Sequence, residues 1–388
     1  MATATAQPQA APKSGKDAKT APVTLRPWFP GTLDLETHTY VKTGTLTTQQ
    51  IPLDTYYPKT NGYLADLWIE MTAVAAGNSA TVAFNEDFPE RALGTFQVSD
   101  TGGQPILGPM TGWELKTFVK WGGFSFSDDP RDSQTFSQIT GAGATGGGFS
   151  WLLQVPIQFV AREPLGVLPN TNSNNSYAVD CTISTLAQIY STAPTNPPTF
   201  TVKIYQDAYR QSSGKDAQKN ATVTTPPGLG AVLYMRRNTV DLATGQIDIE
   251  LSQQEGSYRA MHLVLRDSSQ SRQQGDADWP DPAVVYFNND VPYDRTKNYW
   301  LRKMERQYGY VSTVNTANGR DYGHFVLPFM TDGELKAGSE ARYRYLSVSS
   351  ADTLGFRGTI GGSGTHKLTT MYQFVRPPGG NIKGLTAR

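Results

Sequence analysis

The sequence predicts an all-β fold made of two antiparallel β-sandwiches in one chain. Apolar and polar residues alternate along several segments, which is the pattern of half-buried strands. Turns rich in glycine and proline separate these segments, and no long helical pattern lies between them. The two halves of the chain also repeat the same order of elements. With 388 residues, the chain is long enough for two domains of ordinary size.

The internal repeat is the most informative feature of the sequence. Each half has a β-patterned strand that opens on a tyrosine, at Tyr63 (GYLADLWIEM) and at Tyr258 (SYRAMHLVLR). Each half then has an aromatic segment with helical spacing and a tryptophan near its start, Trp113 or Trp300. The number of residues between the two strands and the number between the two helices agree to within the length of one loop. A duplicated sandwich suits a protein that tiles a surface better than it suits an enzyme.

The predicted domains follow changes in composition along the chain. The N-terminal segment is rich in Ala, Pro, Thr and Lys, and such a composition does not support a packed core. A polar stretch that ends near two prolines separates the two sandwiches. The predicted order is a flexible arm, the first sandwich, a linker, the second sandwich and a C-terminal arm, at residues 1–35, 36–210, 211–230, 231–376 and 377–388.

Several strands are predicted with one apolar face. The inward-facing sets are Leu67, Ile69 and Met71; Phe200, Val202 and Ile204; and Met261, Leu263 and Leu265. The polar or variable residues between them are expected on the opposite face, toward solvent. The loop Ser125–Gly148 is long for a compact domain and is expected to project from the surface.

Two short helices are predicted within this β background. Thr111 and Glu114 have the spacing of a capping box at the start of the first helix. In the second helix, Trp300, Met304 and Tyr308 fall on one face. We expect both helices to lie across a sheet edge or the end of a sandwich, with one apolar face down, in a structural role.

Charge and composition exclude several classes of function. The 34 basic and 34 acidic residues cancel, which argues against a nucleic-acid-binding protein and favours self-association. The N-terminus has no apolar signal-peptide core, and no apolar run approaches the ~20 residues that cross a bilayer. We therefore expect synthesis in the cytoplasm and a soluble chain.

Catalytic and metal-binding motifs are weak. Glycosidases use paired carboxylates, and the candidates here are Glu86, Asp87 and Glu90, with Asp128 and Asp129. All five lie in turn-like contexts, which favours caps and surface charge. The run Asp276, Asp278 and Asp281 lacks the glycine and the distal glutamate of an EF-hand calcium loop. The single cysteine, Cys181, excludes an internal disulfide and is expected to be buried. No enzyme activity and no cofactor are predicted.

Two sets of residues are predicted contacts. Three lysines of the N-terminal arm can meet anionic lipid or an acidic neighbour: Lys13, Lys16 and Lys19. Alternating arginine and tyrosine residues near the C-terminus are typical of protein interfaces and predict a subunit interface: Arg342, Tyr343, Arg344 and Tyr345.

The order of segments resembles a known family over about residues 36–376. The first half resembles the first jelly roll of the tectivirus major capsid proteins through GYLADLWIEMTAVAAGNSA, NEDFPERALGTFQVSDTGGQPI and TGWELKTF. The second half resembles the second jelly roll through YRAMHLVLRDSS, DPAVVYFNNDVPYDRTKNYWLRKMERQYG and GHFVLPFM. These proteins coat tailless, icosahedral bacteriophages that contain an internal membrane.

The resemblance implies a double jelly roll, that is, two eight-stranded antiparallel sandwiches with short helices in each half. It also implies a non-enzymatic major capsid protein, located in the virion, whose trimers form pseudo-hexagonal capsomers over an internal membrane. The implied partners are other copies, vertex (penton) and minor capsid proteins, and membrane lipids near the N-terminal arm, without sequence-specific nucleic-acid binding. Family members can carry an amphipathic N-terminal helix, whereas residues 1–24 here favour a looser contact through lysines, at ~1 kcal/mol each. The alternative is a carbohydrate-binding or carbohydrate-active two-sandwich protein, such as a phage spike.

Overall fold

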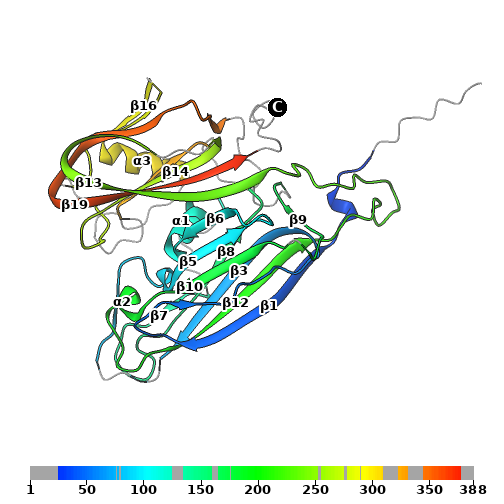
Figure 1. Cartoon of the computed structure of the whole chain (residues 1–388), viewed down its shortest axis with the longest axis horizontal. Coiled ribbons are helices and arrows are strands. Elements are labelled where there is room, and N and C mark those ends of the chain that lie inside the picture. The colour runs from blue at the N-terminus through cyan, green and yellow to red at the C-terminus, as the bar shows by residue number, and fades with distance from the viewer. Residues whose placement is uncertain are drawn as a thin grey trace, which may run out of the picture.

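Two β-sandwiches lie side by side, one formed by each half of the chain (Figure 1). They are seen in a computed structural model of the whole chain. The predicted all-β double jelly roll with short helices in each half is confirmed. The structure describes residues 25–75, 77, 80–124, 134–159, 165–174, 176–251, 255–274, 278–288, 290–308, 322–330 and 344–376.

The first half holds strands of very different lengths and four short helical turns or helices. In chain order these elements are η1 (Phe29–Gly31), β1 (Asp34–Thr45), β2 (Ile51–Pro52), β3 (Gly62–Val74), β4 (Ala83–Phe84), η2 (Glu90–Ala92), β5 (Leu93–Ser99), β6 (Pro105–Met110), α1 (Gly112–Trp121), β7 (Ser137–Gln138), β8 (Phe149–Pro156), β9 (Leu168–Asn170), β10 (Ala178–Ile183), α2 (Leu186–Ile189), β11 (Tyr190–Thr192) and β12 (Thr199–Tyr209).

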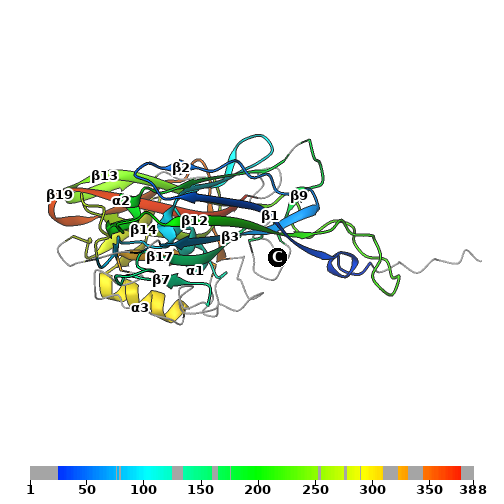
Figure 2. The same ribbon diagram turned by 90° about the horizontal axis from the view of Figure 1, so that it is seen from below.

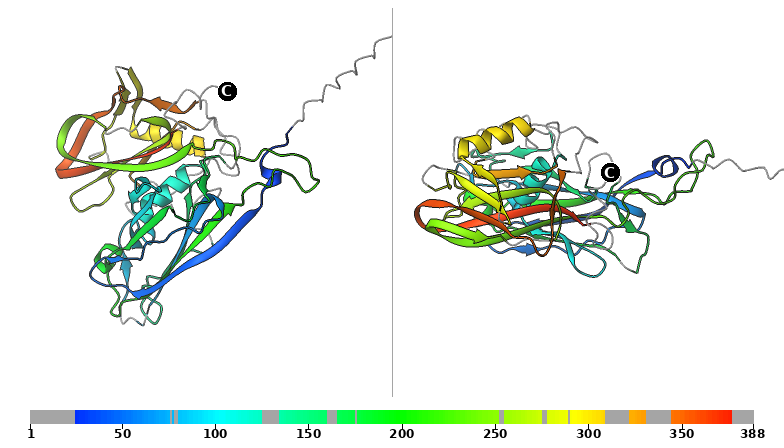
Figure 3. Two further views of the ribbon diagram at one scale, coloured as in Figure 1. Left: turned by 45° about the vertical axis from the view of Figure 1, so that its right-hand side comes forward. Right: turned by 90° about the horizontal axis from the view of Figure 1, so that it is seen from above.

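The second half has fewer and longer strands. Its elements are β13 (Val232–Glu250), β14 (Gly256–Arg266), β15 (Ala283–Phe287), β16 (Asp290–Arg295), α3 (Lys297–Tyr308), β17 (His324–Pro328), β18 (Leu346–Val348) and β19 (Leu354–Arg376). Helix α3 lies on the outside of the molecule (Figures 2 and 3). We call the two sandwiches the first barrel and the second barrel.

The two barrels have the same strand order, which confirms the repeat seen in the sequence. In the first barrel, antiparallel pairing gives the sheets β1-β12-β3-β8 and β2-β10-β5-β6. In the second barrel, β13-β19-β14-β17 is the counterpart of the first sheet. The distal parts of β13 and β19 continue with β15 and β16 into the counterpart of the second sheet. In both barrels a hairpin, β5-β6 or β15-β16, leads directly into the helix, α1 or α3.

Two strands of the second barrel pass from one sheet into the other. β13 pairs with β19 along its length, with a register shift between Ala243 and Gly245. Gly245 has φ +111°, and Gly362 and Gly364 in the facing part of β19 have φ +72° and +92°. Positive φ is the region that glycine adopts readily, so these glycines let the paired strands turn the corner between sheets. The first barrel makes the same turns with loops between separate, shorter strands.

The predicted inward-facing residues are all buried, and one strand differs on its other face. Leu67, Ile69 and Met71 of β3 are fully buried, while Trp68 and Glu70 between them are half-buried. On β14, in contrast, the alternate residues such as His262 are also buried. The prediction of one solvent-facing side was wrong for β14, because a helix of the first barrel packs on that side.

The two predicted helices form, and one is more deeply buried than expected. Thr111 and Glu114 make the predicted capping box of α1. Trp300, Met304 and Tyr308 are the buried face of α3. The expectation of one apolar face was wrong for α1, because all ten of its residues are buried between the two barrels (Figure 1).

The chain enters the first barrel through a projecting module formed by residues 25–33 and 210–230 (Figures 1 and 2). Within it, the Arg26 guanidinium lies 2.9 Å from the Asp216 carboxylate, and Trp28 packs its ring against Tyr63. The predicted linker 211–230 is part of this module. Residues 1–24, 125–133 and 377–388, which include most of the two predicted arms and part of the predicted projecting loop, lie outside the described residues.

Substituting Gly62 by Ala should destabilise the first barrel. Gly62 has φ +115°, and a Cβ there would lie 2.4 Å from the Tyr209 carbonyl oxygen. Gly103 has a similar φ of +79° but no atom within 4 Å of its Cβ position. We expect G103A to cost about 1–2 kcal/mol through backbone strain alone, and G62A to cost about 1–3 kcal/mol more through steric overlap. Urea denaturation of both variants measures the difference, and equal midpoints would contradict the described start of β3.

Candidate functional site

Helix α1 is the centre of the contact between the two barrels. At its N-terminus, the Glu114 backbone N–H donates to Thr111 Oγ1 at 3.3 Å, and the Thr111 backbone N–H donates to the Glu114 carboxylate at 2.7 Å. The same carboxylate forms an ion pair with Arg237 of β13, with 2.9 Å between Oε1 and Nη1. The cap that starts this helix of the first barrel is therefore fixed to the second barrel.

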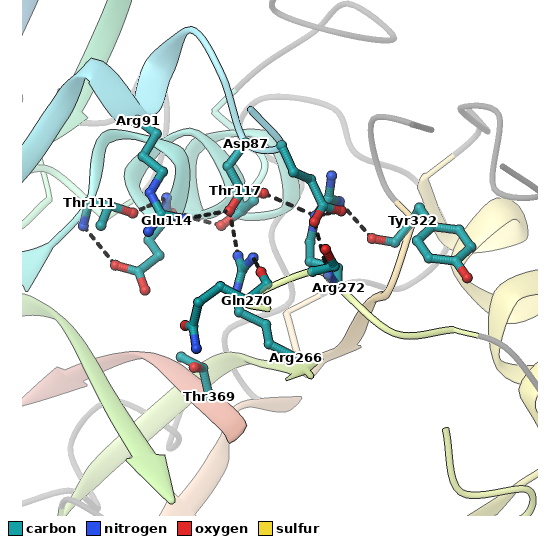
Figure 4. Close-up of polar contacts among 12 residues, drawn as sticks. Asp87, Arg91, Thr111, Glu114, Thr117, Arg266, Gln270, Arg272, Tyr322 and Thr369 are labelled. Carbon is teal, nitrogen blue, oxygen red and sulfur yellow. Dashed lines mark hydrogen bonds and ion pairs between the residues drawn. The ribbon is translucent and has the colours of Figure 1, made fainter. Parts of the chain in front are cut away.

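An ion network crosses the contact beside this cap (Figure 4). Asp87 Oδ2 lies 2.6 Å from Arg266 Nη2, and Asp87 Oδ1 lies 3.0 Å from Arg272 Nε. Arg272 Nε also lies 2.9 Å from Glu86 Oε1. The Tyr322 carbonyl accepts a hydrogen bond from Arg272 Nη1 at 2.6 Å. The turn before η2 in the first barrel is thus held by Arg266, the last residue of β14 in the second barrel, and by Arg272 in the segment that follows β14.

The aromatic ring of Trp113 lies against both of these arginines. The guanidinium carbons of Arg266 and Arg272 are 5.0 Å and 5.1 Å from the ring centroid. Cations over an indole ring gain about 0.5–2 kcal/mol, with the larger values where water is excluded. Trp113 is fully buried, so the first residues of α1 help to position the arginines that bind Asp87.

The pKa values of Asp87 and Glu86 shift in opposite directions. Burial alone would raise the pKa of Asp87, but the positive charges of Arg266, Arg272 and Arg91 outweigh burial and hold this pKa below its ordinary value. Burial raises the pKa of Glu86 despite its ion pair with Arg272. We therefore expect Asp87 to be the carboxylate that stays ionised as the pH falls.

A pair of buried histidines lies under the middle of α1. His262 Nδ1 of β14 and His324 Nε2 of β17 are 3.0 Å apart, and the two rings are stacked. Phe118 of α1 covers His262, with ring centroids 5.1 Å apart, and Trp121 covers His324 at 5.8 Å. Burial lowers the pKa of His262 to about 3. Burial, and then the charges of His262 and neighbouring cations, lower the pKa of His324 well below its usual range. Because both pKa values are lowered, we expect both histidines to be neutral at pH 7.

The C-terminal end of α1 is also satisfied by the second barrel. The last carbonyls of a helix have no partner within the helix. Here Tyr308 Oη donates to the Trp121 carbonyl at 2.8 Å, and Arg259 Nη2 donates to the Gly122 carbonyl at 3.2 Å. Both ends and one face of α1 are therefore bound by side chains that belong to the other half of the chain.

Of the carboxylates that suggested a glycosidase, Glu86 and Asp87 take part in the contact between the barrels, and Glu90 is paired within the first barrel. Glu86 and Asp87 bind arginines, and Glu90 Oε1 lies 3.6 Å from Lys116 Nζ with both side chains buried. They are structural charges that join elements, and they do not flank an open cleft. Asp128 and Asp129 lie outside the described residues.

The residues predicted to contact lipid or another subunit lie in different environments, and some are outside the described residues. Lys13, Lys16 and Lys19, together with Arg342 and Tyr343, lie outside the described residues. Tyr345 is buried, and its hydroxyl accepts a hydrogen bond from Arg259 Nε at 3.3 Å. Its ring therefore belongs to the core of the chain. Arg344 is exposed, and its role at a subunit interface stays a prediction.

The described residues form neither a cluster suited to a metal ion nor a helix suited to span a membrane. No group of three or more His, Cys, Asp and Glu side chains there is placed to hold a metal ion. Of the suggested calcium loop, Asp278 lies 3.8 Å from His366, and Asp281 accepts a hydrogen bond from the Lys297 backbone N–H at 3.0 Å. Among the described helices, none has the length and apolar character to cross a bilayer.

Cys181 is buried, as predicted. Burial raises the pKa of its thiol to about 12, with a smaller effect from Asp180.

The fold matches solved structures, although the sequence does not match known families. No family model matches the chain, and no curated protein matches it in sequence. The MCP of STIV (Sulfolobus Turreted Icosahedral Virus) is 12% identical with a TM-score of 0.58, over 90% of this chain and 100% of its own. PBCV-1 VP54, fitted into a reconstruction of the virophage Sputnik, is 11% identical with a TM-score of 0.60, over 91% and 95%.

A bacteriophage protein has the same fold. The major capsid protein of bacteriophage PM2 is 10% identical with a TM-score of 0.51, over 90% of this chain and 100% of its own. These matches establish the fold class: the chain is a double jelly roll like those of viral major capsid proteins. Because the identities are only 10–12%, the matches establish the fold alone.

Replacing Asp87 by Asn should weaken the contact between the barrels. Asp87 has φ +69°, a conformation that Asn also tolerates, so the substitution removes the charge without adding backbone strain. Removing one partner of a buried ion pair costs about 3–5 kcal/mol. The control is D54N, which removes the exposed pair between Asp54 and Lys42 at a cost of less than about 1 kcal/mol. Urea denaturation compares the two, and equal losses would contradict a buried network.

The histidine pair should make the fold sensitive to acid. The folded pKa of His262 lies near 3 and its ordinary value is 6.5. Between these values the unfolded chain binds a proton that the folded chain does not, so stability falls as pH falls, by about 1.4 kcal/mol per pH unit for each histidine.

Stability measured at pH 7 and pH 5, in the wild type and in H262Q/H324Q, tests this prediction. Burial raises the pKa of Asp66 to about 8, so Asp66 acts in the opposite direction over the same pH range, and the test is the difference between the two proteins. The loss on acidification should be smaller in H262Q/H324Q. An identical loss would show that the histidines do not titrate on unfolding as described.

Proposed function

We propose that this chain is the major capsid protein of a tailless bacteriophage with an internal membrane, and that it forms trimeric, pseudo-hexagonal capsomers in an icosahedral shell. The observation that supports this most strongly is the fixed pair of barrels with identical strand order. Three copies present six similar barrels, so a block with threefold symmetry packs as a hexagon. The similarity to viral major capsid proteins over nearly the whole chain supports the same role.

The chemistry of the chain supports a structural role without enzyme activity. The buried polar groups identified above serve packing: carboxylates of the first barrel bind arginines of the second, and the histidine pair of the second barrel packs under aromatic rings of α1. A balanced charge of 34 basic and 34 acidic residues limits repulsion between many neighbouring copies. Both features suit a protein whose function is to keep its shape while it packs against itself.

The proposed partners follow from this role. Other copies of the chain surround each capsomer, and vertex and minor capsid proteins complete the shell. The lysines Lys13, Lys16 and Lys19 meet anionic lipid of the internal membrane or an acidic neighbour. The protein is made in the host bacterial cytoplasm and functions in the virion. We propose that the predicted domains, 36–210 and 231–376, are the two units that tile.

Sedimentation of the purified protein tests the trimer. A chain of 42.4 kDa should sediment at neutral pH and high concentration as a single species of about three times that mass. The expected state follows from two different barrel faces in each copy, which close a ring by head-to-tail contacts. A stable monomer under these conditions would count against the capsomer, and so would a dimer.

A further inference from the structure

The two barrels use equivalent sheets differently. In the second barrel, the outer face of β13-β19-β14-β17 is covered by α1 of the first barrel, as the contacts of Phe118 with His262 and of Trp121 with His324 show. The counterpart in the first barrel is the outer face of β1-β12-β3-β8. On this face Trp68, Glu70 and Tyr205 are only partly buried. The described chain therefore covers one of two equivalent faces and leaves the other accessible.

The accessible face carries a groove of about 540 Å³. Its floor is largely apolar, from Trp68, Leu152 and Tyr205, and three carboxylates line it, Glu36, Glu70 and Asp207. None of the described lining residues is basic. The groove crosses four neighbouring strands, since these residues come from β1, β12, β3 and β8. We call it the acidic groove.

Negative charge in the acidic groove is only partly compensated. Glu36 lies directly opposite Asp207 in the antiparallel pair of β1 and β12, and like charges in this position are destabilising. Trp68 Nε1 donates to Asp207 at 2.7 Å, and Lys203 Nζ lies 3.4 Å from Glu70. Burial raises the pKa of Asp207, and the charges of Glu36 and Asp34 also raise it. A cationic group placed in the groove would relieve this repulsion.

Helix α3 has the complementary surface. It is the counterpart of α1, because each follows the equivalent hairpin of its barrel. Its buried face packs on its own barrel, while Tyr299, Arg302 and Arg306 are exposed. These three residues are at spacings of three and four, so they form one stripe along the helix. The stripe has an aromatic ring and two guanidinium groups, which suit carboxylates and an apolar, aromatic floor.

We propose that α3 of one copy binds in the acidic groove of a neighbouring copy, so that the contact between subunits repeats the contact between the barrels of one chain. Arg302 and Arg306 pair with Glu36, Asp207 and Glu70, and Tyr299 packs against the aromatic floor. The contact is head-to-tail, because it joins two different surfaces, and it closes into a ring of six barrels after three copies. This inference rests on the proposed capsomer and names the surfaces that build it.

Charge reversal tests the pairing. Sedimentation velocity should find R302E/R306E and E36K/D207K mainly monomeric, with trimer association weakened at least tenfold. The chain that carries all four substitutions should form trimers again, because the charges are exchanged. K215E/K367E, which reverses two exposed lysines elsewhere, is the matched control and should remain trimeric. Loss of trimers in this control, or no recovery in the fourfold variant, would overturn the proposal.

Cysteine cross-linking tests the contact without depending on trimer stability. The native Cys181 is buried, so cysteines introduced at Glu36 and Arg302 are the reactive ones. Under mild oxidation, the double variant E36C/R302C should give covalent species up to three chains on a non-reducing gel. E36C and R302C alone should give none, because a head-to-tail contact does not bring equivalent residues together.

The cross-linking outcomes separate two kinds of failure. Trimers by sedimentation without cross-links in E36C/R302C would leave the capsomer standing and reject the α3 contact. Cross-links of equal yield in the single variants would indicate a two-fold contact and would also reject the proposal. A protein that stays monomeric in every assay would reject the proposed function itself.

Discussion

Helix α1 is buried on all sides, and this burial fixes the two barrels to each other. Its cap binds Arg237, its middle covers His262 and His324, and its last carbonyls accept hydrogen bonds from Tyr308 and Arg259. Separating the barrels would expose these aromatic rings to water and leave the charges of Asp87 and its arginines partly unpaired. Burial of each large apolar side chain is worth about 1.5–3 kcal/mol, so exposing several of them costs an amount comparable with the 5–15 kcal/mol that stabilises an ordinary domain. The double barrel is therefore a single rigid unit, and a single buried apolar cluster runs through it.

The proposed capsomer depends on rigidity of this kind. Six barrels can form a regular hexagon only if the angle within each chain equals the angle between chains. The shared strand order provides similar building blocks, and the buried ion network fixes their orientation. The charges at this contact thus act more on geometry than on net stability, since a buried ion pair often contributes little net stability compared with apolar packing.

Much of this fold could be predicted from the sequence, and the reasons are local. The alternation of Leu67, Ile69 and Met71 with other residues indicates that one face of the strand is buried. The spacing of Thr111 and Glu114 indicates a capping box. The repeat of Tyr63 and Tyr258 indicated two similar units. The contact between the barrels was missed, because it joins Asp87 and Arg266, which lie far apart in sequence. One signal was present: the apolar residues of α1, from Trp113 to Trp121, spread over roughly two thirds of the helix circumference at 100° per residue, which is wider than packing against a single surface needs. Likewise, alternation along 342–345 suggested an interface, but it does not reveal that Tyr345 points into the core.

The most direct test of a rigid double barrel is the distance between the barrels in solution. Spin labels at Y57C in the first barrel and Y299C in the second, both exposed sites, can be measured by double electron–electron resonance after dilution with unlabelled protein. Cys181 is buried and does not compete for the label. A rigid contact gives one narrow distance distribution at pH 7, and D87N broadens it. A broad distribution in the wild-type protein would contradict a fixed pair of barrels.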